Sequence, residues 1–410
     1  MDSGLDIAIV LAAGEGTRMK STTSKVLHTI AGRTIVGHVL AALAPLNSKN
    51  LRVVVGSHRE SVEAHVKEIA PSATTVFQAE RNGTGHAVQL ALEGVKAQGN
   101  ILILAGDTPL LTSFTLKEFL EAHIETGNDV SVLTAQLPDP TGYGRIIRDE
   151  FGAIQRIVEQ RDATEEEQEI DEINTGVYLF KAEALVNSIH KISNNNSQGE
   201  LYLTDVIALI KSESNKAGAI LSNDYTETLG INDRSQLAEC AAIMRDRIND
   251  AHMRAGISII DPTTTWIDAS VTIEPNATIH PGSWLQGTTT VAKDSVIGPR
   301  TTLKNVSVGC CASVIESHCT DSTIGVNANV GPFSFLRPGS VLADGAKVGA
   351  YVEVKNSTIG AGSKVPHLSY VGDATIGTGS NIGAATIFVN YDGVEKHQTV
   401  VGNHVRIGSD

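Results

Sequence analysis

The sequence has few aromatic residues and no excess of positive charge, and each shortage excludes a class of protein. Phe, Trp and Tyr make up 4% of it while Gly occurs 38 times, so the core must consist mainly of Ile, Val, Leu and Ala. The 46 acidic residues outnumber the 32 basic ones, which gives a net charge of -14. Because no local basic patch offsets this charge, we expect neither nucleic acid nor an anionic membrane as a partner.

Cysteines and long apolar runs are scarce as well. No apolar stretch approaches the length of a membrane span, and "IAIVLAAG" near the N-terminus is too short and wrongly flanked for a signal peptide. The cysteines have neither the paired spacing of a zinc site nor the density of a secreted disulfide scaffold; they are Cys240, Cys310, Cys311 and Cys319. We therefore expect a cytoplasmic protein.

The first half of the chain alternates strand-like and helix-like segments. Continuous apolar runs such as "IAIVLA", "LRVVVG", "ILILAGD" and "DVSVLTAQ" are separated by helical patterns such as "TIVGHVLAALAPL" and "TSFTLKEFLEAHIETG". Strands of this kind predict a mostly parallel sheet that is covered on both faces, hence an α/β domain. Since ligands bind beyond the carboxyl ends of such strands, polar residues that follow these runs are site candidates.

The second half has a different period. Residues 235–255 have apolar positions near helical spacing and predict a linking helix. After it, aliphatic residues recur in steps of six at Ile273, Ile279, Leu285, Val291, Ile297 and Leu303, and the pattern resumes with interruptions to Ile407. A period of six with small residues at the corners predicts a parallel β-helix of hexapeptide repeats.

The loop "LAAGEGTRMKSTTSKVL", Leu11–Leu27, follows the first apolar run. Met19 stands where a dinucleotide fingerprint needs its third glycine, and Met19 and Lys20 fail to continue a Walker A motif. What remains is a glycine-containing loop whose amides can approach a polyphosphate, with Arg18 and Lys25 as neutralising cations. A plain strand-to-helix turn with solvated basic residues is the alternative. Asp107, after "ILILAG", suits magnesium as a hard oxygen ligand, although a lone Asp there is more often a turn residue.

Several motifs in one order carry a family resemblance. "LAAGEGTRM", "SKVL", "QAERNGTGHAV", "LAGDTPLL", "GYGRI", "IVEQRDAT" and "EINTGVYLF" resemble the sugar nucleotidyltransferases. With the hexapeptides, nearly the whole chain resembles the bacterial family that joins N-acetylglucosamine-1-phosphate uridylyltransferase to glucosamine-1-phosphate acetyltransferase. The resemblance implies a Rossmann-like domain with a mixed, mostly parallel sheet over residues 1–234, a linker helix over 235–255 and a left-handed β-helix over 256–410. Ser24 departs from the proline that this family has before the lysine.

The resemblance assigns roles in a uridylyl transfer that makes UDP-N-acetylglucosamine, a cell-wall precursor, from UTP. Arg18 and Lys25 would neutralise the phosphates, and Asp107 and Asn232 would hold Mg²⁺. Gln78 with the Gly83–Thr84 turn would read the base, and Gly144, Glu159 and Asn174 would hold the N-acetylglucosamine moiety. The full expected nucleotide and sugar set is Leu11, Ala12, Ala13, Gly14, Lys25, Gln78, Gly83, Thr84, Ala105, Gly106, Asp107, Gly144, Glu159, Asn174 and Asn232.

The resemblance also implies an acetyl-CoA-dependent acetylation of glucosamine 1-phosphate by the β-helix. His367 would be the base that removes the proton from the attacking amine. The cations Arg337 and Lys355 can hold a sugar phosphate. The other implied substrate-binding residues are Tyr370, Asn381, Ala384, Asn390, Tyr391 and Ser409, and Ala385 replaces a usual glycine. Three chains would pack as a homotrimer through their β-helices.

Other functions stay open at this stage. The chain could be a uridylyltransferase whose β-helix serves only for trimerisation, a non-catalytic sugar-nucleotide sensor, or another sugar nucleotidyltransferase such as one that makes ADP-glucose. The chain stops at "IGSD" within a hexapeptide and without a cap, whereas members of the family continue through further coils. We therefore expect a fragment or a truncated product.

Overall fold

The computed structural model describes residues 4–213 and 215–408. These residues form two compact units, one of residues 4–30, 34–213 and 215–240 and the other of residues 31–33 and 241–408. Helix α8, Arg234–Arg254, lies where the sequence predicts a linking helix. In the described residues no helix is both long and apolar enough to cross a bilayer.

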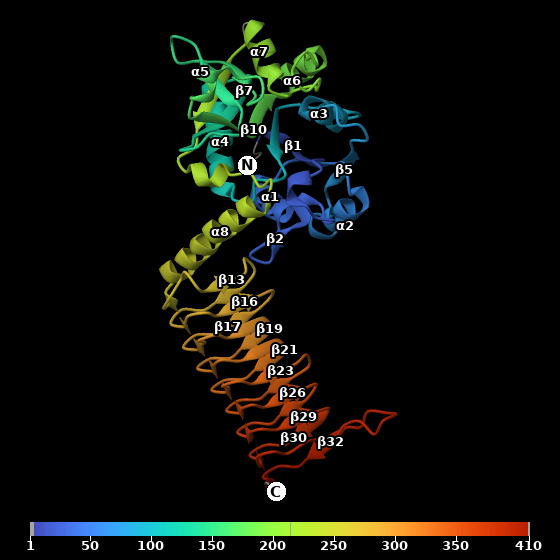
Figure 1. Cartoon of the computed structure of the whole chain (residues 1–410), viewed down its shortest axis with the longest axis vertical. Helices are drawn as coiled ribbons and strands as arrows, with labels where there is room; N and C mark the ends of the chain where they lie inside the picture. Colours follow the sequence, from blue (N-terminus) through green and yellow to red (C-terminus); the bar gives the residue numbers. More distant parts are fainter. Residues whose placement is uncertain (1–3, 214, 409–410) are drawn as a thin grey trace. The chain divides into compact units, whose positions relative to one another are not determined.

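The first unit is built on a nine-stranded sheet with the path β11-β7-β10-β6-β1-β4-β5 (Figure 1). All neighbours on this path are parallel except β10, which runs antiparallel to β6 and β7 and also carries the β8–β9 hairpin. The strands are β1 Leu5–Ala12, β4 Asn50–Val55, β5 Thr74–Phe77, β6 Asn100–Ala105, β7 Val130–Gln136, β8 Arg145–Arg148, β9 Ile154–Val158, β10 Glu172–Lys181 and β11 Ala217–Leu221. The mixed, mostly parallel sheet is therefore confirmed.

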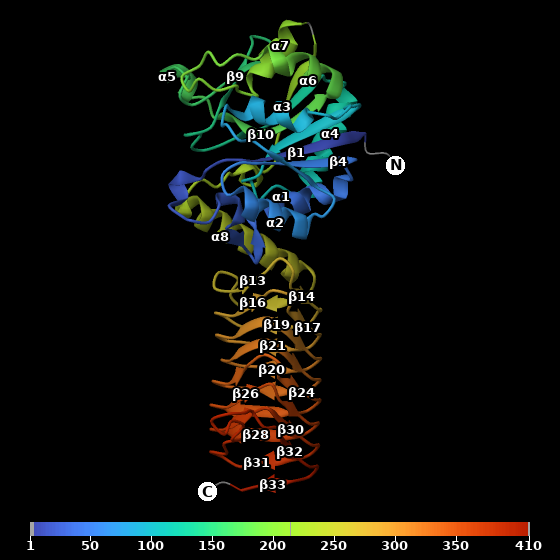
Figure 2. The ribbon, with the colours of Figure 1, turned by 90° about the vertical axis from the view of Figure 1, so that its right-hand side faces the viewer.

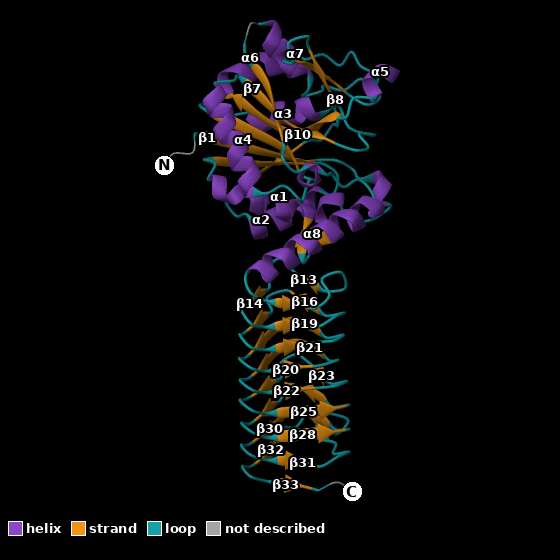
Figure 3. Ribbon diagram, turned by 90° about the vertical axis from the view of Figure 1, so that its left-hand side faces the viewer, coloured by secondary structure: helices purple, strands orange, loops and turns teal. Residues whose placement is uncertain are grey.

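Helices cover both faces of this sheet, as Figure 3 shows. Successive side chains of a strand point to opposite faces, so Ile7 and Ile9 pack with α3, α6 and α7 while Ala8 and Val10 pack with α1, α2 and α4. This double burial explains why the strands read as continuous apolar runs. The helices are α1 Ile35–Leu43, α2 Arg59–Ile69, α3 Thr84–Leu92, α4 Ser113–Thr126, α5 Glu165–Gln168, α6 Ala182–Ser188 and α7 Asp205–Ser212.

The second unit is a stack of coils with three strand faces (Figure 2). Strands of neighbouring coils pair in parallel, for example Ile279 with Ile297 and Leu285 with Leu303. The aliphatic residues of the six-residue period point inward and form one continuous buried cluster, with Ile273 partly buried at its edge. The parallel β-helix predicted from the hexapeptide period is confirmed.

The strands of the β-helix are short and fall into three sets. The first face has β12 Ser258–Ile259, β15 Thr278–Ile279, β18 Val296–Ile297, β20 Ser313–Val314, β22 Asn329–Val330, β25 Lys347–Ala350, β28 Lys364–His367, β31 Asn381–Ile382 and β33 Arg406–Ile407. The second has β13 Trp266–Ile267, β16 Trp284–Gln286, β23 Phe335–Leu336, β26 Glu353–Lys355 and β29 Tyr370–Gly372. The third has β14 Thr272–Ile273, β17 Thr290–Val291, β24 Val341–Leu342, β27 Thr358–Ile359, β30 Ala374–Ile376 and β32 Thr399–Val401. The longer strands β19 Thr302–Val308 and β21 His318–Ile324 run along both the second and third faces.

Candidate active sites

A cavity of about 400 Å³ lies in the first unit, beyond the carboxyl ends of β1 and β6. Its walls contain twelve of the residues that the sequence assigned to nucleotide or sugar: Leu11, Ala12, Ala13, Gly14, Lys25, Gln78, Gly83, Thr84, Ala105, Asp107, Glu159 and Asn174. These residues come from six separate motifs. The sheet brings them together because parallel strands end at the same edge.

The loop after β1 forms one wall of the cavity. Within the described residues the backbone amides of Gly14 and Glu15 donate no hydrogen bond, so they are available to an anion. Gly16 has φ +64°, and a Cβ built on it would lie 2.6 Å from the Cβ of Lys25. The loop therefore packs directly on the stem of Lys25 at a position that only glycine suits.

Lys25 is the central cation of this wall. Its side chain is 9% exposed, and its Nζ donates to Oδ2 of Asp107 and, at 3.2 Å, to Oδ1 of Asn232. The backbone amide of Ile231 donates to the carbonyl of Asp107 at 2.9 Å, which holds the segment that carries Asn232 against the end of β6. Two oxygen atoms from distant parts of the sequence thus converge on one positive charge.

Ser24 starts the short 3-10 turn Lys25–Leu27, and its backbone has φ -52° and ψ 138°. This φ lies within the range that a proline ring imposes. The loop therefore keeps the conformation that proline would favour, and Lys25 is positioned by Gly16 and by its oxygen partners.

The part of the cavity wall that contains Gln78, Gly83 and Thr84, the residues expected to read the base, is held by hydrogen bonds within residues 78–84 and between them and residues 201–203. Gln78 is buried, and its Nε2 donates to the carbonyl of Gly83 at 3.1 Å. The Oγ1 of Thr84 accepts the amide of Leu203 at 3.0 Å, and the amide of Leu201 donates to the carbonyl of Asn82 at 2.7 Å. No described residue donates to Oε1 of Gln78, so this oxygen can accept from a ligand.

The residues assigned to the sugar lie together at another part of the site. The amide of Asn174 donates to the carbonyl of Gly144 at 2.8 Å, and its Nδ2 donates to the Tyr178 hydroxyl at 2.7 Å. A Cβ on Gly144 would lie 3.4 Å from Oε2 of Glu159. Burial, with smaller contributions from nearby Asp162 and Asp205, raises the pKa of Glu159, while a hydrogen bond from Thr204 opposes that rise. A partly buried carboxyl is thus available to accept sugar hydroxyls.

Four expected residues do not line the cavity. Gly106, Gly144 and Asn232 are absent from its lining, and Arg18 lies in the 3-10 turn Thr17–Met19 with an exposed side chain. Arg18 makes no hydrogen bond or ion pair within residues 4–213 and 215–408. Its cationic head is free to reach a bound polyphosphate.

The cavity also contains residues that sequence reasoning did not assign. Arg81 lines it and forms an ion pair with Glu15, and this hydrogen bond lowers the pKa of Glu15 and raises that of Arg81. Glu15 belongs to the motif "LAAGEGTRM" and Arg81 to "QAERNGTGHAV", so the sequence shows both charges but does not predict that they form a pair. The others are Val26, Ala87, Gly176, Tyr178, Glu200, Leu203 and Thr204. Glu200, Leu203 and Thr204 lie in a segment with no recognisable motif.

In the second unit the expected acetyl-transfer residues fall on neighbouring coils. Lys355 forms an ion pair with Asp373 at 3.7 Å, and Nδ2 of Asn390 donates to the same carboxylate and, at 3.4 Å, to the Tyr370 hydroxyl. A Cβ on Gly372 would lie 2.4 Å from that hydroxyl, so the glycine makes room for this cluster. Hydrogen bonds from Asn356 and Asn390, together with Lys355, lower the pKa of Asp373.

The remaining acetyl-transfer residues are dispersed around this cluster. Arg337 pairs with Glu353 at 2.9 Å, and Glu353 lies beside Tyr370 in the strand register. His367 is exposed at the end of β28; its carbonyl accepts from Oγ of Ser369 at 2.7 Å, and its imidazole makes no hydrogen bond to the described residues. Asn381 is in β31, Ala384 follows that strand, and Tyr391 is on the long loop after it. Ser409 lies outside the described residues. Glu353 and Asp373, which sequence reasoning did not assign, neutralise the two expected phosphate-binding cations.

The mixed, mostly parallel sheet with a cavity beyond its carboxyl edge is the architecture of an α/β domain that binds its ligand at that edge. The Nucleotidyl transferase family matches residues 7–269. "Bifunctional protein GlmU" of Streptomyces avermitilis is 52% identical over 405 residues, which cover 98% of this chain and 84% of that protein. The proteins of the same name from Corynebacterium glutamicum and Corynebacterium diphtheriae are 50% and 48% identical, with the same coverage. The chain belongs to this GlmU family of bifunctional nucleotidyl transferases.

Proposed function

We propose that the chain makes UDP-N-acetylglucosamine in two reactions. The β-helix transfers an acetyl group from acetyl-CoA to the amine of glucosamine 1-phosphate. The first unit then transfers UMP from UTP to N-acetylglucosamine 1-phosphate and releases pyrophosphate. The observation that carries this proposal is the cavity that gathers Gly14 of the loop after β1 with Lys25, Asp107, Gln78 and Glu159.

Uridylyl transfer needs charge neutralisation more than a proton acceptor. An oxygen of the sugar phosphate, already an anion, attacks the α-phosphorus of UTP, and the bond to the pyrophosphate oxygen breaks. The free amides of Gly14 and Glu15 and the cations Arg18 and Lys25 surround the place where charge develops. Gln78 would orient the uracil, and Glu159 with Asn174 would orient the sugar so that its phosphate faces the α-phosphorus.

We further propose Mg²⁺ as the cofactor of this reaction. Asp107 and Asn232 present two oxygen donors that already converge on one cation, the ammonium of Lys25, and such hard oxygens are the ligands that magnesium prefers. When bound, the ion would neutralise phosphate charge during the transfer. Lys25 would then be free to bind a phosphate oxygen.

For acetyl transfer, His367 would take a proton from the amine as it attacks the thioester carbon, and CoA would leave as the thiol. Lys355 and Arg337 would hold the sugar phosphate, while Tyr370 and Asn390 would orient the amino sugar. The exposed His367 and the dispersed residues support a site that neighbouring chains complete.

We propose that this assembly is a homotrimer in the cytoplasm. One corner of the β-helix exposes the apolar side chains of Phe333, Tyr351 and Leu368 on successive coils, and Phe333 stacks on Tyr351 with ring centroids 5.2 Å apart. The loop after β31 projects from the coils (Figure 1) and exposes Ile387 and Val389. Apolar surfaces of this kind mark contacts between proteins. Sedimentation equilibrium tests the state, with three chains expected and a monomer contradicting it.

Two assays separate the proposal from its rivals. Free-thiol release from acetyl-CoA with glucosamine 1-phosphate, lost in His367→Ala, supports the second activity. No release by the wild type would leave a uridylyltransferase with an inert β-helix. Magnesium-dependent pyrophosphate release from UTP excludes a non-catalytic sensor, and its absence in a folded protein that binds UTP would overturn the proposal.

A further inference from the structure

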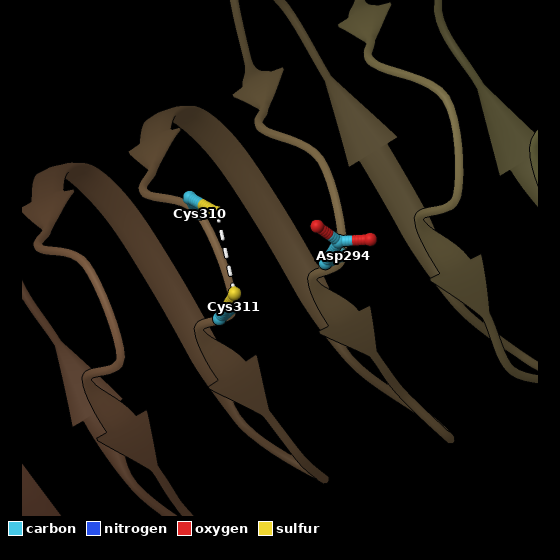
Figure 4. Close-up of side chains that lie close together, drawn as sticks. All are labelled: Asp294, Cys310 and Cys311. Carbon is cyan, nitrogen blue, oxygen red and sulfur yellow. Dashed lines mark hydrogen bonds between the residues drawn. The ribbon is translucent and has the colours of Figure 1, made fainter.

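Two adjacent cysteines lie at a corner of the β-helix, and neither of them belongs to the residues of either proposed reaction. Cys310 and Cys311 belong to the turn between β19 and β20, and their sulfur atoms are 3.2 Å apart (Figure 4). The carboxylate of Asp294, on the preceding coil, lies within 4.8 Å of both sulfurs. Three potential ligand atoms therefore meet at one point on the surface.

The backbone at this corner does not call for cysteine. The same position in every coil, two residues before each strand of the first face, has a left-handed backbone with φ between 55° and 93°. Its occupants are Gly256, Asn276, Asp294, Cys311, Asn327, Gly345, Gly362, Gly379 and His404. Gly, Asn, Asp and His are the residues that tolerate this conformation best. Cys311 is the exception, so its presence has no conformational explanation.

The corner also places the carboxylate of Asp294 beside the thiols. The amide of Cys311 donates to the carbonyl of Lys293 at 3.1 Å, which stacks the two coils in register. Within the described residues Asp294 makes no hydrogen bond or ion pair, although its side chain is exposed and charged. Its oxygen atoms are therefore available to a ligand.

The geometry disfavours a disulfide between the two cysteines. The Cα atoms of adjacent residues across a trans peptide are about 3.8 Å apart, below the range of about 4.4–6.8 Å that unstrained disulfides need. A disulfide in this arrangement would be strained and easily reduced, so the two cysteines stay available as thiols. Both thiols are accessible, in contrast to the buried Cys240 and Cys319.

We propose that Cys310, Cys311 and Asp294 form a binding site for a thiophilic divalent cation of the Zn²⁺ and Cd²⁺ class. Two thiolates and a carboxylate supply three ligands, and water completes a tetrahedral shell on the solvent side. Two metal–sulfur bonds form while two S–H bonds break, and the protons pass to the buffer. Because Asp294 belongs to the preceding coil, the bound ion ties two coils together.

Proton competition sets the conditions of binding. The hydrogen bond between the thiols, more than their partial burial, raises the pKa of Cys310, and Asp294 adds to the rise while Lys293 opposes it. The release of about two protons per bound ion is a direct signature of coordination by both sulfurs.

The test uses the full chain, kept reduced by a reductant that contains no thiol, and Cd²⁺ as the probe. We expect one equivalent of Cd²⁺ to produce the near-ultraviolet absorption of cadmium–thiolate bonds. Cys311→Asn should abolish it, and since Asn occupies this corner in neighbouring coils, that variant keeps the backbone conformation. Asp294→Asn should keep the absorption but weaken binding by about tenfold or more.

The matched control is Asp321→Asn, which removes an exposed left-handed aspartate at another corner and should bind Cd²⁺ as the wild type does. No absorption in the wild type, or the same absorption in Cys311→Asn, would overturn the site. Equal affinity in Asp294→Asn and the wild type would overturn the role of the carboxylate.

Discussion

Replacing Gly16 with alanine tests how the loop positions Lys25. A Cβ at residue 16 would lie 2.6 Å from the Cβ of Lys25, whereas ordinary contacts begin near 3.4 Å, so the stem of Lys25 must move by roughly 1 Å. A displacement of about 1 Å in an active site can slow catalysis by about 100-fold. The left-handed backbone at φ +64° adds a loss of about 1–2 kcal/mol in the free energy of unfolding.

The assay is pyrophosphate release from UTP and N-acetylglucosamine 1-phosphate, measured together with urea unfolding. Gly94→Ala is the matched control, because Gly94 has φ +72° and nothing within 4 Å of a built Cβ. It should lose similar stability and keep full activity. If Gly16→Ala keeps kcat within about twofold of the wild type, the contact with Lys25 does not position the catalytic cation.

Four further predictions follow from the same structure. Ser24→Pro should raise the free energy of unfolding by about 0.4–1 kcal/mol without changing kcat, because φ at Ser24 is already -52°, and urea unfolding with kinetics checks both. Burial, helped by Lys181, lowers the pKa of His123 to about 4. Between about pH 6.5 and 4 the unfolded chain therefore binds a proton at His123 that the native chain does not bind. The free energy of unfolding should fall by about 3 kcal/mol as the pH drops through this range. His123→Gln should remove that dependence in unfolding curves recorded across this range. Glu159→Gln should raise KM for the sugar phosphate by about 10–100-fold, and an unchanged KM would contradict the role of Glu159. Because burial raises the pKa of Glu159, the native state disfavours its ionised form. The variant should therefore have the higher free energy of unfolding at neutral pH. Ala385→Gly should raise stability by about 0.5–1 kcal/mol, because Ala385 has φ +58°, and a loss of stability would refute the strain.

The sequence predicts most of the architecture because periodic burial dominates it. The six-residue aliphatic period is the inward-facing set of the β-helix, and the continuous apolar runs are strands buried on both faces. The loop after β1 could be predicted as a site candidate because it follows a continuous apolar strand, and its binding of phosphate stays a prediction. In the acetyl-transfer half, by contrast, Asp373 went unassigned because its link to Lys355 and Asn390 spans separate coils.

Contacts between side chains that are far apart in the chain could not be predicted from the sequence. The convergence of Lys25, Asp107 and Asn232 depends on how residue 231 is held against β6. The part of the cavity wall that contains Thr204 is held by hydrogen bonds from the backbone amides of Leu201 and Leu203, which lie in a segment with no periodic pattern. The backbone conformation at Ser24 could not be predicted either, because a serine does not by itself indicate the proline-like φ that the structure shows there.

The central claim is uridylyl transfer at the cavity that contains Asp107. The most direct measurement compares pyrophosphate release from UTP, ATP and dTTP with N-acetylglucosamine 1-phosphate and Mg²⁺, for the wild type and for Asp107→Asn. We predict that UTP is used fastest and that Asp107→Asn, still folded by circular dichroism, loses about 100-fold or more of that rate. Equal rates with all three nucleotides, or full activity in Asp107→Asn, would contradict the account.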